Sequence, residues 1–339
     1  ADAAVVGERT LVRAGAGIDE QTALWAASAL RSVRESADWA DGRIRGRRTD
    51  ALGAIILSST PVGVTEESAA IALTDAVRSA LLRLAHGDPA GAAFTGLARE
   101  EEVEAFEALR GRLGLLHHVR GAPWPAVGAV RLADTLEDWL GLEIQRAARA
   151  FAPRRGAGSG PQRTVRLRLH EALQGLLPWP EAADLDRLVP PRVPVPSGSA
   201  VRLTYPRPEE HTGPGPAADH GPADPRSADA PGRAGSDAPG RAGSADARTA
   251  PPVLAVKLQE MFGVQEGPAV IDGQVPVLVH LLSPARRPLA VTADLASFWD
   301  GAYAHVRAEN RGRYPKHPWP KDPRTATPTA HTSKRAARA

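Results

Sequence analysis

The sequence predicts an α+β protein made of a small β-rich module, a helical array and a C-terminal αβ module. Three observations predict this fold class: short alternating segments near the N-terminus, helical spacing of apolar residues through the middle, and mixed strand and helix patterns toward the end. A stretch without large apolar side chains interrupts the last module. With 339 residues, of which 42% are hydrophobic, the chain can build a sizeable core and is long enough for more than one domain.

The β-rich module is predicted over residues 1–62. The segment TLVRAG favours a strand, and IDEQTALWAASA has the apolar spacing of a helix. The stretch SVRESADWADGRIRGRRTDALGAIILSSTPV alternates in the manner of short antiparallel strands, and its Asp41-Gly42 pair is a strong hairpin signal. Together these features predict a short β-meander.

The helical array is predicted over residues 64–188. Thr65, followed by Glu66 and Glu67, has the pattern of a helix start before ESAAIALTDAVRSALLRLA. Further helical patterns lie in EEEVEAFEALRGRLGLLHHVR, RLADTLEDWLGLEIQRAARA, TVRLRLHEALQGLL and EAADLDRLV. We therefore expect an array of about four packed helices.

The αβ module is predicted over residues 189–205 plus 253–323. Strand patterns lie in VPVPSGSAVRLTY and VPVLVHLLSP, and RRPLAVT is expected to pair with the latter across a Ser-Pro turn. PVLAVKLQEMFG has helical periodicity that ends at Gly263. Asp294 is placed to cap a helix over LASFWDGAYAHVRAE.

The segment 206–252 is predicted to be a disordered linker. It holds ten prolines and seven glycines, and no Val, Ile, Leu, Met, Phe, Trp or Tyr, so it has nothing to bury. The octapeptide DAPGRAGS occurs twice in tandem, a pattern typical of local duplication rather than of a solenoid repeat. The linker is thus expected to interrupt one αβ module.

Charge and composition narrow the class of protein. The chain has no cysteine, no apolar run of membrane-spanning length and no N-terminal signal pattern, which favours a cytoplasmic protein without a membrane partner. The net charge of +3 is uneven, since residues 311–339 carry eight Lys or Arg against one Asp. A basic, flexible tail is predicted over 324–339, suited either to a polyanion or to simple solvation.

The segment RGRYPKHPWPKDP, from Arg311 to Pro323, is the candidate nucleic-acid interface. Its four prolines exclude a regular helix or a central strand, and its stiffness suits a strap laid over the αβ module. Its aromatic residues either stack on bases or pin the segment to the domain. The nucleic-acid-binding candidates, including those in the tail, are Arg311, Arg313, Lys316, His317, Trp319, Lys321, Lys334, Arg335 and Arg338.

The motifs of common enzymes are missing from the sequence. There is no G-x-x-x-x-G-K-[ST] phosphate loop, no H-E-x-x-H zinc motif and no G-x-S-x-G nucleophile motif. The neighbours His117 and His118 lie in a predicted helix, where adjacent side chains point about 100° apart and do not share a metal. We expect no catalytic, cofactor-binding or metal-binding residues in this chain.

The last third, PVLAVKLQEMFGVQEGPAVIDGQVPVLVHLLSPARRPLAVTADLASFWDGAYAHVRAENRGRYPKHPWPKDP, closely resembles the C-terminal region of the HrpB-type ATP-dependent helicases of the DEAH-box superfamily. VPSGSAVRLTY, TLEDWL, LQGLLPW and DGRIRGRRTDALGAIIL follow the order expected of that family. The resemblance implies that residues 1–62 are an OB-like accessory module. The long stretch at 206–252 and the glycines near 155–161 depart from the family pattern and indicate loop insertions.

The resemblance also implies which parts are missing. Family members carry two RecA-like motor domains that bind ATP and magnesium, but this sequence has neither a phosphate loop nor a DEAH box, because Asp19-Glu20 is followed by Gln-Thr. We therefore expect a fragment of a helicase, inactive alone, whose partners are a RecA-like motor on the same or a separate polypeptide and single-stranded RNA or DNA. The alternative is a structural or protein-interaction module without nucleic-acid binding.

Overall fold

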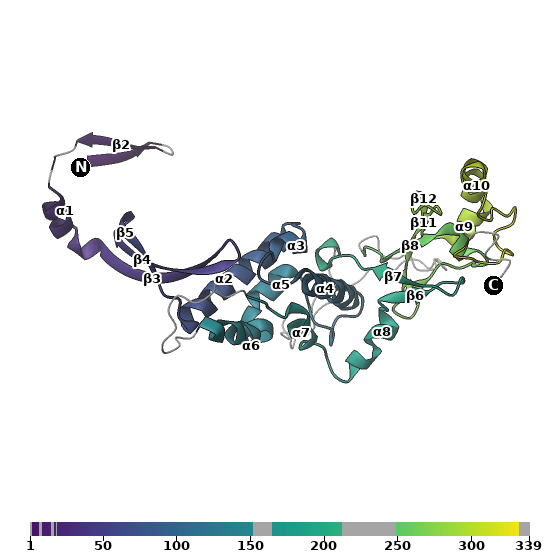
Figure 1. The fold of residues 1–339 in the computed structure, drawn as a ribbon, viewed down its shortest axis with the longest axis horizontal. Helices are drawn as coiled ribbons and strands as arrows, with labels where there is room; N and C mark the ends of the chain where they lie inside the picture. The colour runs from purple at the N-terminus through teal and green to yellow at the C-terminus, as the bar shows by residue number, and fades with distance from the viewer. Residues whose placement is uncertain are drawn as a thin grey trace, which may run out of the picture. The chain divides into compact units, whose positions relative to one another are not determined.

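The structure of the chain, a computed structural model, describes residues 2–6, 9–14, 17, 19–151, 165–211 and 249–331. Within them the chain contains both helices and sheets, as the α+β prediction requires (Figure 1). It divides into two compact units. The first is formed by Ala1–Ser79, Thr95–Leu97 and Gly141–Leu167, and the second by Ala80–Phe94, Ala98–Leu140 and Arg168–Ala339.

The first unit contains two small antiparallel sheets. One pairs β1 (Asp2–Val6) with β2 (Arg9–Ala14), and the other has the order β3 (Arg31–Ala40), β4 (Arg43–Leu52), β5 (Ile55–Val62). The predicted hairpin turn is confirmed: Asp41 and Gly42 have φ values of 51° and 73°, as a two-residue primed turn requires. An OB-fold closes five strands into a barrel, whereas the described strands here form separate sheets of two and three.

Helices follow the meander in both units. Thr65 starts the first long helix as predicted, because its side chain and that of Ser68 exchange hydrogen bonds with each other's backbone amides. Gly121, with a φ of 66°, ends the longest described helix. The helices of this region are α1 (Glu20–Ala26), α2 (Glu66–Ala85), α3 (Ala90–Ala93), α4 (Glu100–Arg120), α5 (Ala129–Asp134), α6 (Leu136–Ala148), α7 (Leu169–Gln174) and α8 (Leu185–Leu188).

The second unit also contains a five-stranded mixed sheet with the order β12-β11-β8-β7-β6. The predicted pairing of β11 with β12 across the Ser283-Pro284 turn is confirmed, and Asp294 caps the following helix through the Ser297 amide. That helix breaks at Gly301 into α9 and α10. The elements are β6 (Arg192–Pro194), β7 (Ala200–Thr204), β8 (Val253–Lys257), β9 (Ala269–Val270), β10 (Val275–Pro276), β11 (Leu278–Leu282), β12 (Pro288–Thr292), α9 (Leu295–Asp300) and α10 (Ala302–Arg313).

One element was predicted wrongly. The helix expected over PVLAVKLQEMFG is strand β8 followed by a 3-10 turn over Leu258–Met261. β8 lies between β7 and β11, where Leu254 and Val256 alternate inward and are buried. Pairing on both edges therefore outweighs the helical spacing of a short apolar run, which periodicity alone cannot distinguish from a buried strand.

The ends of the predicted linker are packed. Residues 206–211 cross α4 over two glycines, since a Cβ added at Gly114 would lie 2.6 Å from Cγ of Pro208 and one at Gly111 3.1 Å from the Pro206 carbonyl oxygen. On the far side of the linker, Pro252 is buried and its carbonyl accepts the Leu278 amide. The disordered linker predicted over 206–252 therefore does not include its first six and last few residues, and 212–248 lie outside the described residues.

The crossing over α4 gives a prediction about two glycines. Gly114→Ala should destabilise the protein by about 1–3 kcal/mol, because the methyl group collides with Pro208. Gly141→Ala, in α6 with nothing within 4 Å of the added Cβ, should instead stabilise by about 0.5–1 kcal/mol through helix propensity. Urea unfolding of both variants measures this. If the free energy of unfolding changed in the same direction in both variants, the close packing of residues 206–211 on α4 would be contradicted.

Candidate nucleic-acid interface

The segment Tyr314–Pro323, which we call the strap, follows α10 and packs back on it. The Tyr303 hydroxyl donates to the Pro320 carbonyl at 2.8 Å, and Nε of Arg307 donates to the Trp319 carbonyl at 2.8 Å. At the far end, the Gly263 amide donates to the Pro323 carbonyl at 3.0 Å. The strap is thus tied to α10 and to the loop after β8, in agreement with its predicted placement over the αβ module.

An aromatic cluster lies beneath the strap. Tyr303 contacts Trp299 at a ring distance of 5.5 Å and Phe262 at 6.3 Å, both edge to face. Phe298 packs edge to face on Trp299 at 5.0 Å. Burial raises the pKa of Tyr303 to about 12, so its hydroxyl keeps the proton that it donates to the strap. The cluster explains why Trp299 is a core residue.

The aromatic residues of the strap are half-buried. The Trp319 indole N–H donates to the Tyr314 carbonyl at 3.1 Å, which folds the strap on itself. Trp319 also lines a groove of about 860 Å³ together with Phe262 and Pro328. His317 is half-buried, and burial followed by the nearby charge of Lys257 lowers its pKa. Trp319 and His317 are therefore half-buried packing residues, and contact of either with a base stays a prediction.

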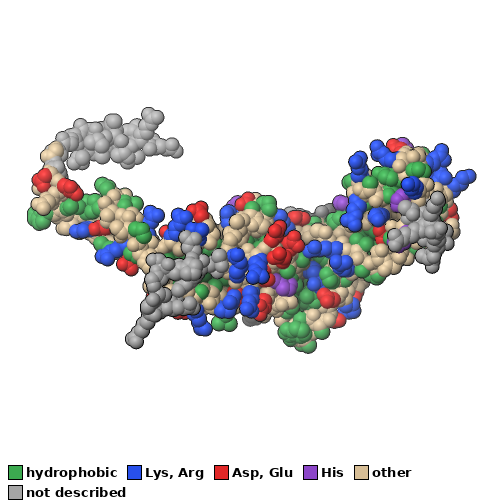
Figure 2. Space-filling view, viewed as in Figure 1, with side chains coloured by type: hydrophobic (Ala, Val, Ile, Leu, Met, Phe, Trp, Pro, Cys, Tyr) green, Lys and Arg blue, Asp and Glu red, His purple; other side chains and the backbone are tan. Residues whose placement is uncertain are grey.

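The predicted cations of the strap region stay exposed. Arg311, Arg313, Lys316 and Lys321 are all exposed and form no ion pair with any described residue. On the face drawn in Figure 2, Lys and Arg side chains of this part lie on several sides and do not gather into one patch. The predicted tail residues Lys334, Arg335 and Arg338 lie outside the described residues, whereas residues 324–331 are described and the Thr329 amide donates to the Gln259 carbonyl.

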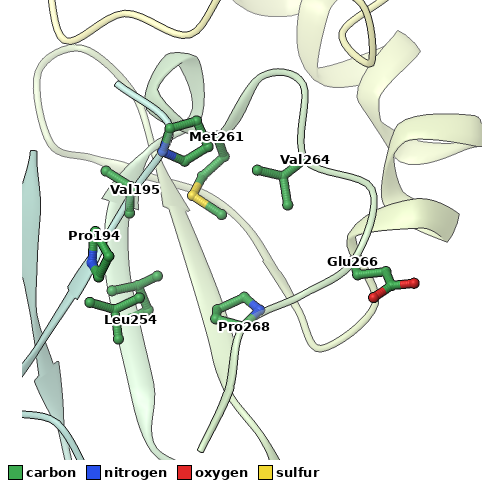
Figure 3. A pocket seen from close by; sticks show the side chains of 9 residues that line it. Pro194, Val195, Leu254, Met261, Val264, Glu266 and Pro268 are labelled. Carbon is green, nitrogen blue, oxygen red and sulfur yellow. The ribbon is translucent and has the colours of Figure 1, made fainter. Parts of the chain in front are cut away.

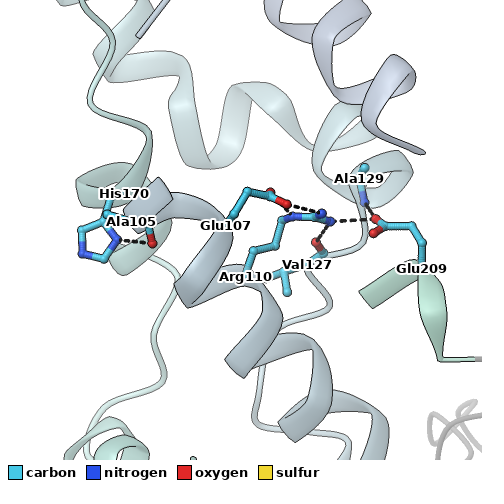
Figure 4. Close-up of polar contacts among 7 residues, drawn as sticks. All are labelled: Ala105, Glu107, Arg110, Val127, Ala129, His170 and Glu209. Carbon is cyan, nitrogen blue, oxygen red and sulfur yellow. Dashed lines mark hydrogen bonds and ion pairs between the residues drawn. The ribbon is translucent and has the colours of Figure 1, made fainter. Parts of the chain in front are cut away.

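A buried charge network, which the sequence did not reveal, holds the segment before the linker. Arg110 of α4 is fully buried and donates to Glu107 and Glu209, each at 2.7 Å (Figure 4). The same Glu209 oxygen accepts the Ala129 amide at 2.6 Å. Burial alone raises the pKa of Glu209, but the charge and hydrogen bond of Arg110 outweigh it and lower the pKa. The network is structural, since Arg110 and one oxygen of Glu209 are bonded within it, while the buried second oxygen, Oε2, has no hydrogen-bond partner among the described residues.

His118 of α4 lies beside His211, the last described residue before the linker. The His118 and His211 rings stack at 4.9 Å, and His118 Nε2 is hydrogen-bonded to the Thr249 hydroxyl at 2.9 Å. Burial, followed by the charge of His118, lowers the pKa of His211 to about 4. The neighbouring His117 is bonded to the Trp124 carbonyl instead. The two adjacent histidines therefore have separate structural partners.

A second cavity, of about 360 Å³, opens beside strand β6 (Figure 3). Its labelled walls are apolar side chains from the β6 hairpin, from β8 and from the loop after it. The carboxylate of Glu266 lies at its edge and is directed away from the other side chains (Figure 3). No polar groups converge in this cavity, so its lining offers packing without chemistry.

A basic groove of about 690 Å³ lies between α4 and the β6–β7 hairpin. Sequence reasoning missed it, because its arginines come from three separate segments. Arg192 and Arg202 face each other across the hairpin, and Arg207 and Arg112 lie beside them. The only sequence signal was the equal spacing of two arginines, each four residues from the turn at residues 196–198.

Over the described ranges, no cluster of three or more His, Asp or Glu side chains is arranged to hold a metal ion. No described helix is long and apolar enough to cross a bilayer.

Comparison with known proteins places the chain in a family. Residues 153–214 and 238–323 match the family described as "ATP-dependent helicase C-terminal", HrpB_C. The chain carries the C-terminal region of the HrpB-type helicases. It is 35% identical over 231 residues to the "ATP-dependent RNA helicase HrpB" of Escherichia coli (strain K12), a match that spans 67% of this chain and 22% of that protein.

The HrpB likeness extends to the fold. A crystal structure of the E. coli "DExH-box NTPase HrpB" superposes with a TM-score of 0.54 and 27% identity, covering 95% of this chain and 32% of that one. The chain therefore spans about a quarter to a third of the length of the relatives it matches. The strap region falls inside the second matched segment, so the strap belongs to the part that HrpB-type proteins share.

Proposed function

We propose that this chain is an accessory region of an ATP-dependent RNA helicase, supporting the motor and contributing contact to a nucleic-acid strand. The observation that carries the proposal is the match of both halves of the αβ module, on either side of the linker, to the HrpB helicase C-terminal family. The E. coli relative is named as an RNA helicase, which favours RNA over DNA as the strand. Such a protein works in the cytoplasm.

The chain contributes no ATP turnover of its own in this proposal. It has no phosphate loop, and ATP and magnesium are bound by RecA-like motor domains, which are its partner on the same or a separate polypeptide. Its contribution to strand contact is electrostatic, because Arg311, Arg313, Lys316 and Lys321 are exposed and have no described acidic partner. Such cations bind backbone phosphates without sequence preference.

The test is a titration of labelled single-stranded RNA into the chain at two salt concentrations. If the four strap-region cations each meet a phosphate, the affinity should fall roughly 50-fold between 50 and 200 mM salt. The double variants Arg311→Ala/Arg313→Ala and Lys316→Ala/Lys321→Ala should each weaken binding and reduce the salt dependence. Arg286→Ala/Arg287→Ala, in the exposed β11–β12 turn, is the matched control. Absence of binding at 50 mM salt would reject the nucleic-acid part of the proposal.

The second candidate function is a structural or protein-interaction module. It is favoured by the packing of Tyr314, His317 and Trp319 against the αβ module and by the scattered placement of the cations. In that case, the chain should bind the motor domains and stimulate or stabilise them while the RNA titration stays flat. A co-purification of the chain with the RecA-like domains separates the two functions.

A further inference from the structure

The basic groove contains facing positive charges, which destabilise the folded protein. Its side walls are α4, the β6–β7 hairpin and residues 205–207. The charged and aromatic side chains that line it are Glu104, Glu107, Arg112, Arg192, Arg202, Tyr205 and Arg207. All of them belong to the second unit.

Arg192 and Arg202 are direct cross-strand neighbours. Hydrogen-bonded pairs lie one position before them and three positions after them, since Leu203 N–H donates to the Pro191 carbonyl and Val195 N–H to the Ser199 carbonyl, and such pairs alternate along the hairpin. The arginines are thus a non-hydrogen-bonded pair, in which side chains stand closest. Like charges directly opposite each other destabilise a hairpin.

The longer β3–β4 hairpin has the opposite arrangement of facing charges. There Glu35 faces Arg48 and Asp38 faces Arg45, so that facing charges attract. The β6–β7 pair places two exposed arginines directly opposite each other, where an anion between them would relieve the repulsion.

The remaining charges of the groove leave an excess of positive charge. Arg112 is neutralised by Asp186 and donates to the Val189 carbonyl at 2.7 Å. Arg192 makes one long bond, 3.3 Å, to the Ala200 carbonyl. Arg202 and Arg207 form no ion pair with a described residue. On the acidic side, Glu107 is occupied by Arg110, and Glu104 is the one lining carboxylate without a described cationic partner.

The groove is also held rigidly. Tyr205 donates its hydroxyl to the Pro190 carbonyl at 2.8 Å, and burial raises its pKa, so this bond persists at any physiological pH. Two residues beyond Arg207, Glu209 anchors the chain to buried Arg110. Binding therefore orders the arginine side chains but needs little ordering of the backbone that carries them, because that backbone is already fixed.

We propose that this groove binds the backbone phosphates of single-stranded RNA, with Arg192 and Arg202 holding one phosphate between them and Arg207 meeting the next. The proposal rests on the nucleic-acid part of the proposed function and adds a specific site to it. Guanidinium groups suit phosphate because their planar fork of donors matches its oxygens. The site is separate from the exposed cations of the strap region.

The decisive variant is Arg202→Glu, which puts a carboxylate opposite Arg192 and should raise the thermal midpoint of the protein by favourable cross-strand pairing. The same change should lower the affinity for a labelled single-stranded oligouridylate by tenfold or more at 50 mM salt. A stabilised protein that binds less well cannot be explained by misfolding. Arg286→Glu, with the same charge change in the exposed β11–β12 turn, should bind within about twofold of the unaltered chain.

A second variant removes charge without adding an acid. Arg192→Ala/Arg202→Ala should make the plot of log affinity against log salt shallower by about 0.7, the value for one phosphate contact on a single strand. If this variant binds RNA as tightly as the unaltered chain while the strap variants lose affinity, the groove is not an RNA site and the proposed function still holds. No RNA binding by the unaltered chain would overturn both. If polyglutamate of equal charge displaces the RNA, the groove is not a phosphate site. It is then a surface that docks an acidic protein segment.

Discussion

Arg110→Ala should lower the free energy of unfolding by about 3–5 kcal/mol, one of the largest effects expected for any substitution in the chain. The guanidinium is fully buried and is the common partner of Glu107 and Glu209. Its removal leaves two carboxylates close together without their cation, and loss of one partner of a buried pair is costly for that reason. Burial by itself lowers the pKa of Arg110, but its acidic partners raise it above the usual value, so the charge is present at all working pH values.

The control for this prediction is an exposed pair with similar spacing. Arg78 and Asp75 are three residues apart on α2 and meet at 3.4 Å, with both side chains largely exposed. Arg78→Ala should cost about 0–1 kcal/mol, as surface ion pairs do. Urea unfolding followed by circular dichroism measures both variants. A loss below about 1 kcal/mol for Arg110→Ala would show that the network is not what holds residues 206–211 on α4.

The pH dependence of this network follows from the lowered pKa of Glu209. A carboxylate with a depressed folded-state pKa contributes stability above its unfolded pKa, and loses that contribution as the pH falls through the folded value. The unaltered chain should therefore lose this stabilisation on acidification. Arg110→Ala should lose less of its remaining stability over the same acid range, because the contribution is already gone.

Sequence patterns predicted the elements in which local signals and tertiary packing agree. The Asp41-Gly42 turn and the Asp294 cap depend on a few adjacent residues, and both are present in the structure. Strand β8 was predicted as a helix because its neighbours on both sides lie far away in the sequence. Propensity and periodicity describe one segment at a time, whereas a central strand is stabilised by its partners.

The residues of the candidate site are even harder to predict from single segments of the sequence. The exposed strap cations could be named from composition, but Glu209, the second partner of Arg110, lies 99 residues away, beyond any local pattern. A signal did exist: Arg110 falls between Phe106 and Leu113 on the apolar stripe of α4, where an arginine must be paired. The basic groove likewise needs the hairpin register before Arg192 and Arg202 become neighbours.

The structural role of the strap changes how its function must be tested. Its carbonyls accept hydrogen bonds from Tyr303, Arg307 and the Gly263 amide. Deleting residues 311–339 would therefore open the aromatic cluster as well as remove the cations. Loss of RNA binding after such a deletion would not identify the cause, whereas exposed single-residue changes at Lys316 or Lys321 leave the packing in place.

Tyr303→Ala should lower the free energy of unfolding by about 3–5 kcal/mol, the range for removing a large aromatic side chain from a core. Tyr303 is 2% exposed, packs on Phe262 and Trp299, and bonds the strap at Pro320. Tyr303→Phe keeps the ring contacts and loses only the hydroxyl, so it should cost about 0.5–1.5 kcal/mol. The difference between the two variants separates packing from the single bond to the strap.

Hydrogen exchange at the Gly263 amide reports on the strap itself, because that amide is bonded to the Pro323 carbonyl at 3.0 Å. Exchange at Gly263 should accelerate strongly in Tyr303→Ala and only slightly in Tyr303→Phe, while amides of β3 and β4 in the first unit stay as protected as before. Unchanged exchange at Gly263 in Tyr303→Ala would show that the strap is held independently of the cluster. Acceleration there would establish that the aromatic cluster holds the strap in place. The RNA contacts that we propose for the basic side chains of the strap region would then need no ordering of a flexible tail.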